Sequence, residues 1–426
     1  MGENEDMVRE RVFRDPVHGN IRIEDPAILA VIDAPEFQRL RRIRQLGMCF
    51  NTYHGAEHSR FQHSIGAMWI MHRILASWAD RGYLEVTREK RRAACLAALL
   101  HDLGHGPFSH ALEHTFSHYR HEDLGRDLLV RRLAPMLEAL DVDVTTVVGL
   151  IMGTTQDTFL HELISSQLDV DRMDYLMRDS LYAGVKYGMF DLERVIATLL
   201  PLHDGDRVVT AIDPKGVHAV EEYIFCRYFM YWQVYFHKTT RASEVLLRLV
   251  LRRARELAPH IYLPPNLAFL FNAQSDWIDA FVDIDDYDIF HCIKLWQREK
   301  DEVLSGLAEH FTHRRLFKMI PCPDAEGVDR VRGLMDKRYG EMAGYYWHLD
   351  RPHDSAYDFY RSGHGKDVIR VKSNGGWAEI SEAAMTGAIR ALAQEVSKTW
   401  LCVAPECHAD VLAVLGMDCP MGAVTV

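Results

Sequence analysis

Apolar residues recur at helical spacing along most of the chain, but the first stretch differs. There, β-favouring residues around Pro16 and Gly19 predict short extended segments joined by a turn over residues 10–25. Over residues 26–47, apolar residues three and four positions apart predict helical structure that breaks at Ala34–Pro35. We therefore expect a small extended element followed by helices.

The helices expected next are longer. One follows Ser59, because Ser59 and Gln62 have the spacing of a capping box. Another, over residues 88–106, has a wholly apolar middle and is expected to be buried before it stops in a glycine-rich turn. Further helical patterns cover residues 110–118, 121–140 and 161–184, and one very long helix is expected over residues 219–258.

The pattern changes after about residue 320. Short β-favouring runs at 367–373, 376–381 and 399–405 surround a helical pattern at 382–398, and an earlier run at 206–213 predicts a hairpin. The expected fold class is therefore mainly α. We predict a helical body over residues 1–320 and a small α/β lobe over residues 321–426.

Composition places the protein among ordinary globular chains. Of 426 residues, 48% are hydrophobic and 26% charged, which excludes a disordered or fibrous chain. No window approaches the length of a membrane span, and the polar start has no signal-peptide core, so a cytoplasmic protein is expected. The net charge of −12 argues against nucleic acid as a partner, although a local basic channel stays open. Eight scattered cysteines predict reduced thiols.

Histidine is over-represented in one segment. Six of the 23 histidines fall between His101 and His121, a density that packing does not need and a metal site does. His101 and Asp102 end the apolar helix and point roughly 100° apart, so both can approach one ion. A buried carboxylate there costs several kcal/mol unless a charge compensates it, and a divalent cation is the natural partner. Alone, such a pair would more often be a satisfied buried pair.

The surrounding residues strengthen the metal interpretation. His63 lies on the preceding helix and Asp171 on a later one, and Gly104 and Gly106 let the backbone turn tightly after Asp102. Other acid and base side chains stand nearby in the sequence: His105, His110, Glu113, His121 and Glu122.

The order of these residues resembles a known family. The runs are RFQHSIG, HDLGHGPFSH, HE and DVDRMDY, with DPVHGNI, IDAPEFQRLRRIRQLG and YWQVYFHKT outside them. Together they are similar to the HD phosphohydrolase superfamily, and more narrowly to its deoxynucleoside triphosphate triphosphohydrolases, the dNTPases. The resemblance covers roughly residues 11–320, with the HD core at about 50–185.

The resemblance implies a metal centre formed by His63, His101, Asp102 and Asp171. The ion would be Mg, Mn or Fe, with Ni or Zn as alternatives. Family members hydrolyse a dNTP at the α-phosphorus and release nucleoside and inorganic triphosphate. His110, paired with Glu113, is then the candidate acid for the leaving 5′-oxygen. His105, His121 and Glu122 would line the pocket and orient a water or a second metal.

The resemblance also implies a set of substrate-binding residues: Gln45, Arg60, Arg172, Tyr175, Asp179, Arg227 and Tyr235. Arg60 shares a helix face with His63, and Arg172, Tyr175 and Asp179 follow one helical stripe beside Asp171. The cations would bind phosphates. Tyr175 would exclude a 2′-hydroxyl, and Asp179, with Gln45, would accept from the 3′-hydroxyl.

A second, regulatory site is implied at subunit contacts of a homo-oligomer, most simply a tetramer. A guanine nucleotide (GTP) would be held by Arg11, Asp33, Gln38, Arg41, Arg315 and Lys318, and a dNTP effector by Arg194, Lys215, His237 and Lys238. The alternative is that these residues form ordinary surface pairs and that the enzyme has no effectors.

Three functions are compatible with the sequence. The leading hypothesis is a metal-dependent dNTP triphosphohydrolase. The second is an HD-type phosphatase, phosphodiesterase or nuclease with another nucleotide or a nucleic acid as substrate. The third is a non-catalytic nucleotide-sensing protein, which the intact acid and base residues argue against.

Overall fold

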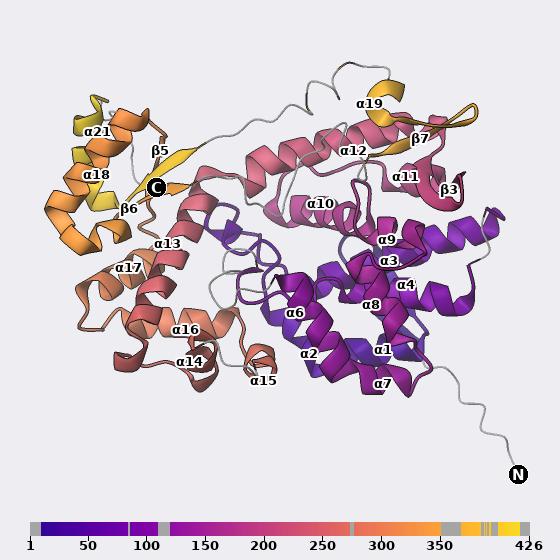
Figure 1. Ribbon diagram of the computed structural model, residues 1–426, viewed down its shortest axis with the longest axis horizontal. Helices are drawn as coiled ribbons and strands as arrows, with labels where there is room; N and C mark the ends of the chain where they lie inside the picture. Colours follow the sequence, from indigo (N-terminus) through magenta and orange to yellow (C-terminus); the bar gives the residue numbers. More distant parts are fainter. Residues whose placement is uncertain are drawn as a thin grey trace, which may run out of the picture.

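The computed structural model describes residues 10–83, 86–109, 120–272, 277–350, 368–384, 387, 389, 392 and 399–417. Helices dominate these residues, and the strands form small sheets, which confirms the expected mainly α fold (Figure 1). The expected helices over 110–118 and most of 382–398 lie outside the described residues. No described helix is long and apolar enough to cross a membrane.

The chain starts with the predicted extended element. Strands β1 (Arg11–Asp15) and β2 (Gly19–Ile23) form an antiparallel hairpin in which Asp15 pairs with Gly19. The helices that follow build the N-terminal body: α1 (Pro26–Asp33), α2 (Pro35–Gln38), α3 (Arg60–Asp80), α4 (Arg88–Leu100), α6 (His121–Leu128), α7 (Ala134–Glu138), α8 (Val144–Met152), α9 (Thr158–Ile164), α10 (Val170–Ala183) and α11 (Leu192–Thr198). Their short connectors include η1 (Arg39–Arg42), η2 (Cys49–Asn51) and the π-helical turn η4 (Leu129–Leu133).

Helices α3, α4 and α10 pack together and carry the residues that matter most below. As predicted, α4 is buried over its second half, from Ala93 to Leu100. Helix α10 begins where the Asp169 side chain accepts a hydrogen bond from the Arg172 amide at 2.7 Å. It ends at Gly184, whose φ of 70° is the left-handed conformation that suits a helix C-terminus.

The second half of the chain crosses the molecule and forms its other end (Figure 1). Its helices are α12 (Val217–Met230), α13 (Lys238–Glu256), α14 (Pro265–Phe271), α15 (Ile278–Val282), α16 (Asp286–Trp296), α17 (Glu302–Thr312), α18 (Ala325–Tyr339), α19 (Ile380–Ala383) and α21 (His408–Leu415). Its one-turn elements are η5 (Pro214–Gly216), the π-helical turn η6 (Tyr231–Tyr235), η7 (Ala258–His260), η8 (Gly340–Tyr345) and η10 (Pro405–Cys407).

The strands of the C-terminal segment are divided between two sheets. Strands β5 (Lys318–Pro321), β9 (Trp400–Val403) and β6 (Trp347–Asp350) form one antiparallel sheet beside α18 and α21. Strands β7 (Arg370–Ser373) and β8 (Gly376–Glu379) instead extend the hairpin of β3 (Leu199–Asp204) and β4 (Arg207–Ile212). Residues 370–379 thus pack on the N-terminal body, and the domain boundary at 320 stays a prediction.

Three local expectations are wrong. The pattern predicted over 161–184 is not one helix, because α9 ends at Ile164 and α10 begins at Val170. The helix predicted over 219–258 is interrupted, because η6 follows α12 and His237 has an extended backbone (ψ 127°), with its ring accepting from the Thr239 amide to start α13. Ser59 precedes α3 but makes no side-chain cap. Instead, an isolated bridge between Arg44 and Ser59 and a 3.0 Å bond from the Arg60 amide to Ile43 fix this helix start.

The approach of α10 to α3 depends on Gly66. An added Cβ at Gly66 would lie 2.0 Å from Asp174 Oδ1 and 2.4 Å from Arg178 Nη2, both buried side chains of α10. Those side chains bind each other and cannot move aside without losing their bonds. A glycine is therefore needed where α3 faces this pair.

We expect Gly66→Ala to lower the free energy of unfolding by about 3 kcal/mol, because overpacking at this contact separates α3 from α10. Urea denaturation followed by circular dichroism measures the loss. Gly306→Ala is the matched control: its Cβ would meet nothing within 4 Å on α17, so the unfolding free energy should rise by about 0.5–1 kcal/mol. Equal effects of the two substitutions would contradict the packing argument.

Candidate metal centre

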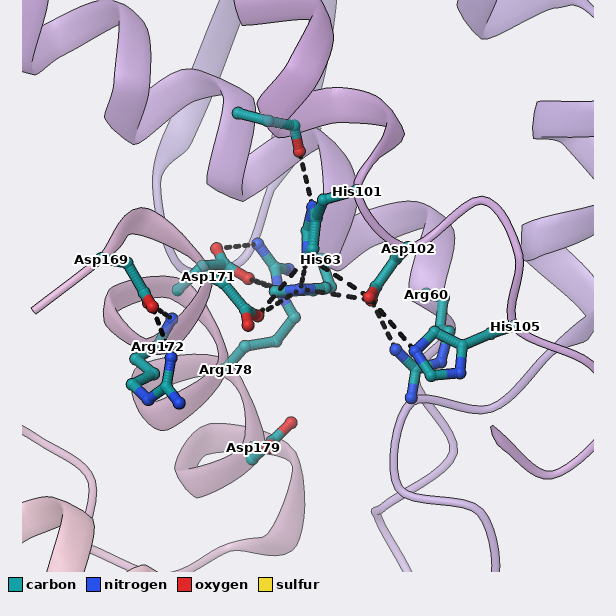
Figure 2. Close-up of polar contacts among 12 residues, drawn as sticks. Arg60, His63, His101, Asp102, His105, Asp169, Asp171, Arg172, Arg178 and Asp179 are labelled. Carbon is teal, nitrogen blue, oxygen red and sulfur yellow. Dashed lines mark hydrogen bonds and ion pairs between the residues drawn. The ribbon is translucent and has the colours of Figure 1, made fainter. Parts of the chain in front are cut away.

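Three side chains from separate helices direct donor atoms to one point. His63 comes from the first turn of α3, His101 from the residue after α4, and Asp171 from the first turn of α10. His63 Nε2 lies 3.3 Å from His101 Nε2 and 3.1 Å from Asp171 Oδ1, and His101 Nε2 lies 3.5 Å from the same oxygen (Figure 2). One atom of each residue can therefore contact a single ion.

These separations fit a cation. Donors at about 2.1 Å from one ion are about 3.0 Å apart at right angles and about 3.4 Å apart in a tetrahedron. Asp102 lies beside this group of three: its Oδ2 lies 3.5 Å from His63 Nε2, and its other oxygen, Oδ1, lies 3.4 Å from His101 Nε2. The structure thus brings together all four residues predicted to hold the metal. Imidazole nitrogens with carboxylate oxygens suit Mg, Mn, Fe, Ni or Zn.

Each histidine is oriented by a bond from its other ring nitrogen. His63 Nδ1 donates to Asp174 Oδ2 at 2.8 Å, and His101 Nδ1 donates to the carbonyl oxygen of Ala98 at 2.8 Å. Because Nδ1 is engaged as a donor, Nε2 is the nitrogen that faces the other donors, and it can bind a cation once its own proton has left.

The partner of His63 belongs to a buried network that sequence reasoning missed. Arg178 binds Asp174 through two nitrogens, each at 2.8 Å, and its third nitrogen binds Asp15 at 2.8 Å. His18 Nε2 donates to Asp174 Oδ1 at 2.7 Å from the turn between β1 and β2. The N-terminal hairpin therefore contacts the carboxylate that holds His63. In the sequence, His18 is marked only by the DPVHGNI run, which is part of the family resemblance but gives His18 no role.

The electrostatics of the four donors favour a cation. Burial alone would lower the pKa of His63, but hydrogen bonds to Asp171 and Asp174 outweigh it and raise this pKa to about 10. Likewise, burial disfavours the charged form of His101, yet nearby Asp102 and Asp171 raise its pKa. Burial alone would raise the pKa of Asp171, but hydrogen bonds from His101 and His63 hold it far below its usual value. Asp171 is the most exposed of the four at 29%, so solvent reaches the centre on its side.

Three of the five predicted acid and base residues, His105, His121 and Glu122, lie in the described part of the chain. His105 Nε2 lies 3.3 Å from Asp102 Oδ1, and its ring stacks on His121 with centroids 4.0 Å apart. Glu122 follows, with a carboxylate oxygen 3.5 Å from His121 Nδ1. Gly104 permits this approach, since an added Cβ would lie 1.9 Å from the His121 carbonyl oxygen. His110 and Glu113 lie outside the described residues.

Arg60 binds one member of the metal-facing group, which consists of His63, His101, Asp102 and Asp171. Its Nη1 binds Asp102 Oδ2, and its Nε donates to Ser109 Oγ at 2.7 Å. The hydroxyl of Ser109 donates in turn to the Arg44 carbonyl at 2.8 Å. Arg60 is buried and compensates the charge of Asp102 from the side away from His63 and His101 (Figure 2).

The loop after Asp102 is also held by Asp286, a buried residue that the sequence did not single out. Asp286 Oδ1 accepts from the Phe108 amide at 2.7 Å, and Oδ2 accepts from the Arg44 amide at 3.0 Å. Burial raises the pKa of Asp286 to about 6. The first residue of α16 is therefore bonded to two segments of the N-terminal body.

The predicted sugar-binding residues form a second group on α10. The buried Tyr175 ring lies 6.4 Å from the His63 ring and 6.0 Å, edge-on, from the Tyr235 ring. Tyr235 Oη donates to Asp179 Oδ2 at 2.9 Å, and His58 Nε2 donates to Asp179 Oδ1 at 2.7 Å. Tyr235 lies in the π-helical turn η6, and His58 was not predicted.

Two predicted phosphate-binding arginines meet near Tyr175. Arg172 binds Asp169, and Arg227 Nη1 donates to Gln167 Oε1 at 2.6 Å. Burial and the neighbouring charge of Arg172 lower the pKa of Arg227. Gln45 is the remaining substrate candidate. Its backbone N–H donates to the backbone carbonyl of His58 at 2.9 Å.

The residues predicted to bind a guanine nucleotide fall into two places. Arg11 pairs with Asp33 through two bonds of 2.6 and 2.8 Å, and Arg41 donates to Gln38 at 2.8 Å. Arg315 and Lys318 lie near β5, at the other end of the molecule (Figure 1). One chain does not bring the two parts together.

The second predicted effector group is also divided. Arg194 donates to the Lys215 carbonyl at 2.9 Å, before α12. His237 and Lys238 follow η6, about 30 Å further along the helical path. The effector assignments stay predictions.

The segments that carry these residues are similar to known proteins. The family described as HD domain matches residues 60–179, and the family described as HD associated region matches residues 190–341. Protein YwfO of Bacillus subtilis (strain 168) is 39% identical over 396 residues, which cover 89% of this chain and 88% of that protein. A crystal structure of a phosphohydrolase from Bacteroides thetaiotaomicron VPI-5482 has a TM-score of 0.81 at 31% identity and covers 92% of this chain and 99% of that one.

A more distant relative is named for its activity. The deoxynucleoside triphosphate triphosphohydrolase SAMHD1 of Gallus gallus is 28% identical over 382 residues. The match covers 80% of this chain and 61% of that protein, so the chain spans less than two thirds of this relative.

We expect His18→Ala to weaken Mn²⁺ binding about 10- to 100-fold, because it removes one of the donors that orient Asp174 and thereby His63. Titration calorimetry with the folded variant measures the dissociation constant. His313→Ala is the control, since that side chain is half exposed and lies 3.4 Å from Glu309. Unchanged Mn²⁺ affinity in His18→Ala would show that the hairpin does not support the metal-facing group.

Proposed function

The chain belongs to the HD-domain superfamily of phosphohydrolases, and we propose that it is a metal-dependent dNTP triphosphohydrolase. The reaction would convert a dNTP and water into a deoxynucleoside and inorganic triphosphate. The observation that carries the proposal is that Tyr175 and Asp179, the candidate sugar-binding residues, lie on the same helix as Asp171, a candidate metal ligand. The SAMHD1 relative supports the same activity.

The donor set defines what a cofactor would add. A divalent cation held by His63, His101, Asp102 and Asp171 would supply Lewis-acid polarisation of a phosphoryl oxygen and a more acidic water. The protein's own residues would do the rest. Arg60, Arg172 and Arg227 supply the positive charge that a triphosphate needs, and two of these guanidinium groups lie close enough that a bound anion would relieve their repulsion.

The leaving 5′-oxygen of the nucleoside requires a proton. His105 and His121 are stacked beside Asp102 and are positioned to hold protons near the reacting group. His110 with Glu113 remains the candidate acid proposed from the family resemblance. The exposed side of Asp171 is the route by which water and substrate would arrive.

The aromatic group would select the sugar. Tyr175 is buried and held edge-on by Tyr235, so its ring cannot yield easily to an added 2′-hydroxyl. Asp179 is a carboxylate held between His58 and Tyr235, a fixed acceptor for a sugar hydroxyl. A rigid ring and a rigid acceptor on one helix favour deoxyribose.

We also propose effector nucleotides and a homo-oligomer. The support is the division of each predicted effector group between distant parts of the chain, since such groups can meet only across a contact between subunits. The exposed Arg11–Asp33 pair is available for such a contact.

We expect the wild-type protein with Mg²⁺ or Mn²⁺ to release deoxynucleoside and triphosphate from dNTPs, resolved by ion-pair chromatography. Asp171→Asn should lose bound metal and at least about 3 kcal/mol of transition-state stabilisation, about a hundredfold in kcat/KM, because it removes a metal-facing charge. Asp329→Asn, an exposed partner of Arg332, is the control.

The product distinguishes the alternatives. Release of a mono- or diphosphate would indicate another HD-type phosphatase or phosphodiesterase, and cleavage of single-stranded DNA or RNA would indicate a nuclease. Nucleotide binding without turnover would indicate a nucleotide sensor. Each of these outcomes would contradict the proposed reaction.

We expect Tyr175→Ala to raise the kcat/KM ratio of ATP to dATP about tenfold, because removing the ring opens space for the 2′-hydroxyl. Tyr175→Phe keeps the ring and should keep the wild-type ratio. Steady-state rates with both nucleotides test the two variants side by side. If the wild type already hydrolyses ATP as fast as dATP, this residue does not select the sugar.

A further inference from the structure

Asp286 connects the C-terminal half of the protein to the loop that follows the His101–Asp102 pair. Its side chain is fully buried and accepts three bonds: from the Phe108 amide at 2.7 Å, the Arg44 amide at 3.0 Å and Arg44 Nη1 at 3.3 Å. The contact spans 178 residues of sequence between Asp286 and Phe108. Helix α16 therefore binds the backbone of this loop through one carboxylate.

The loop needs such support. Phe108 and Ser109 have φ values of 54° and 55°, a left-handed conformation that non-glycine residues rarely adopt and that persists only when surrounding contacts impose it. The Phe108 ring also packs edge-on against Phe290 of the same helix, with centroids 5.1 Å apart. Helix α16 thus holds both the backbone and the side chain of Phe108.

Hydrogen bonds connect the backbone at Phe108 and Ser109 to Asp102 of the metal-facing group. Ser109 follows Phe108 and bridges the Arg44 carbonyl (2.8 Å) and Arg60 Nε (2.7 Å). Arg60 in turn binds Asp102 through Nη1. An uninterrupted series of bonds therefore runs from Asp286 through Arg44 and Ser109 to Arg60 and Asp102.

We propose that Asp286 is a positioning residue for the active site, acting through Ser109 to fix Arg60 and Asp102. This inference rests on the proposed function, since it gives Asp286 a role in that same site. A carboxylate suits the role because both of its oxygens accept, and each faces a backbone N–H. An asparagine would turn an NH2 group toward one of these donors and break one side of the contact.

The test compares Asp286→Asn with Asp285→Asn. Asp285 is also at the start of α16, where it caps the Tyr287 amide at 2.9 Å and binds Arg42, and its bonds in the described residues do not include the loop. We expect Asp286→Asn to lower kcat/KM for dNTP about tenfold and to weaken Mn²⁺ binding in calorimetry. Asp285→Asn should keep both values within about twofold.

A double-mutant cycle separates positioning from general loosening. If Asp286 acts through Ser109, the losses in kcat/KM from Asp286→Asn and Ser109→Ala will not add, and the double variant will resemble Ser109→Ala alone. Full additivity, or wild-type kcat/KM and Mn²⁺ affinity in Asp286→Asn, would overturn the proposal.

Failure of the proposed function has a different signature. A wild-type protein that does not release triphosphate would count against that function, while the Mn²⁺ affinities of Asp286→Asn, Asp285→Asn and Ser109→Ala would still decide whether Asp286 positions Asp102. Coupled losses in affinity support the role, and independent or absent losses contradict it.

Discussion

Asp174 holds its negative charge in a fully buried position, where a carboxylate is stable only when donors surround it. Two nitrogens of Arg178 and one each of His18 and His63 supply those donors. Removing one partner from a buried pair of this kind costs about 3–5 kcal/mol. The compensation of this one charge therefore brings α10, α3 and the N-terminal hairpin together and orients the ring of His63.

Around this centre, the body is arranged so that separate segments each supply one contact. Gly66 lets α10 approach α3, and Gly104 lets the loop after Asp102 approach α6. Asp286 then reaches the same loop from α16, in the region matched by the HD-associated family. The metal-facing atoms are thus fixed from three sides, and the side of Asp171 is left open to solvent. A preorganised group with one open side is what hydrolysis of a large anion requires.

The sequence predicted these features unequally. His63, His101, Asp102 and Asp171 lie in short distinctive runs, so their convergence could be expected. His18 and Asp286 could not, because their partners are 156 and 178 residues away and no local pattern marks the pairing. The break between α12 and α13 was missed because apolar and aromatic residues continue through the π-helical turn at 231–235, so no change of composition marks it. The pairing of β7 with β4 depends on a contact between Val371 and Ile212 that such short strands do not encode.

The contacts of the N-terminal hairpin affect when the group around His63 is completed during folding. Two antiparallel strands are only marginally stable alone, and this pair is exposed along much of its length. Ile21 and Ile23 of β2 are buried in the core, and the polar contacts of the hairpin with α10 include Asp15 with Arg178 and His18 with Asp174. A cation bound near His63 and a docked hairpin therefore stabilise each other, since both rely on the same carboxylate. The orientation of His63 therefore depends on a contact between residues 15–18 and residues 174–178, which are far apart in the sequence, so the group around His63 is complete only after this long-range contact has formed.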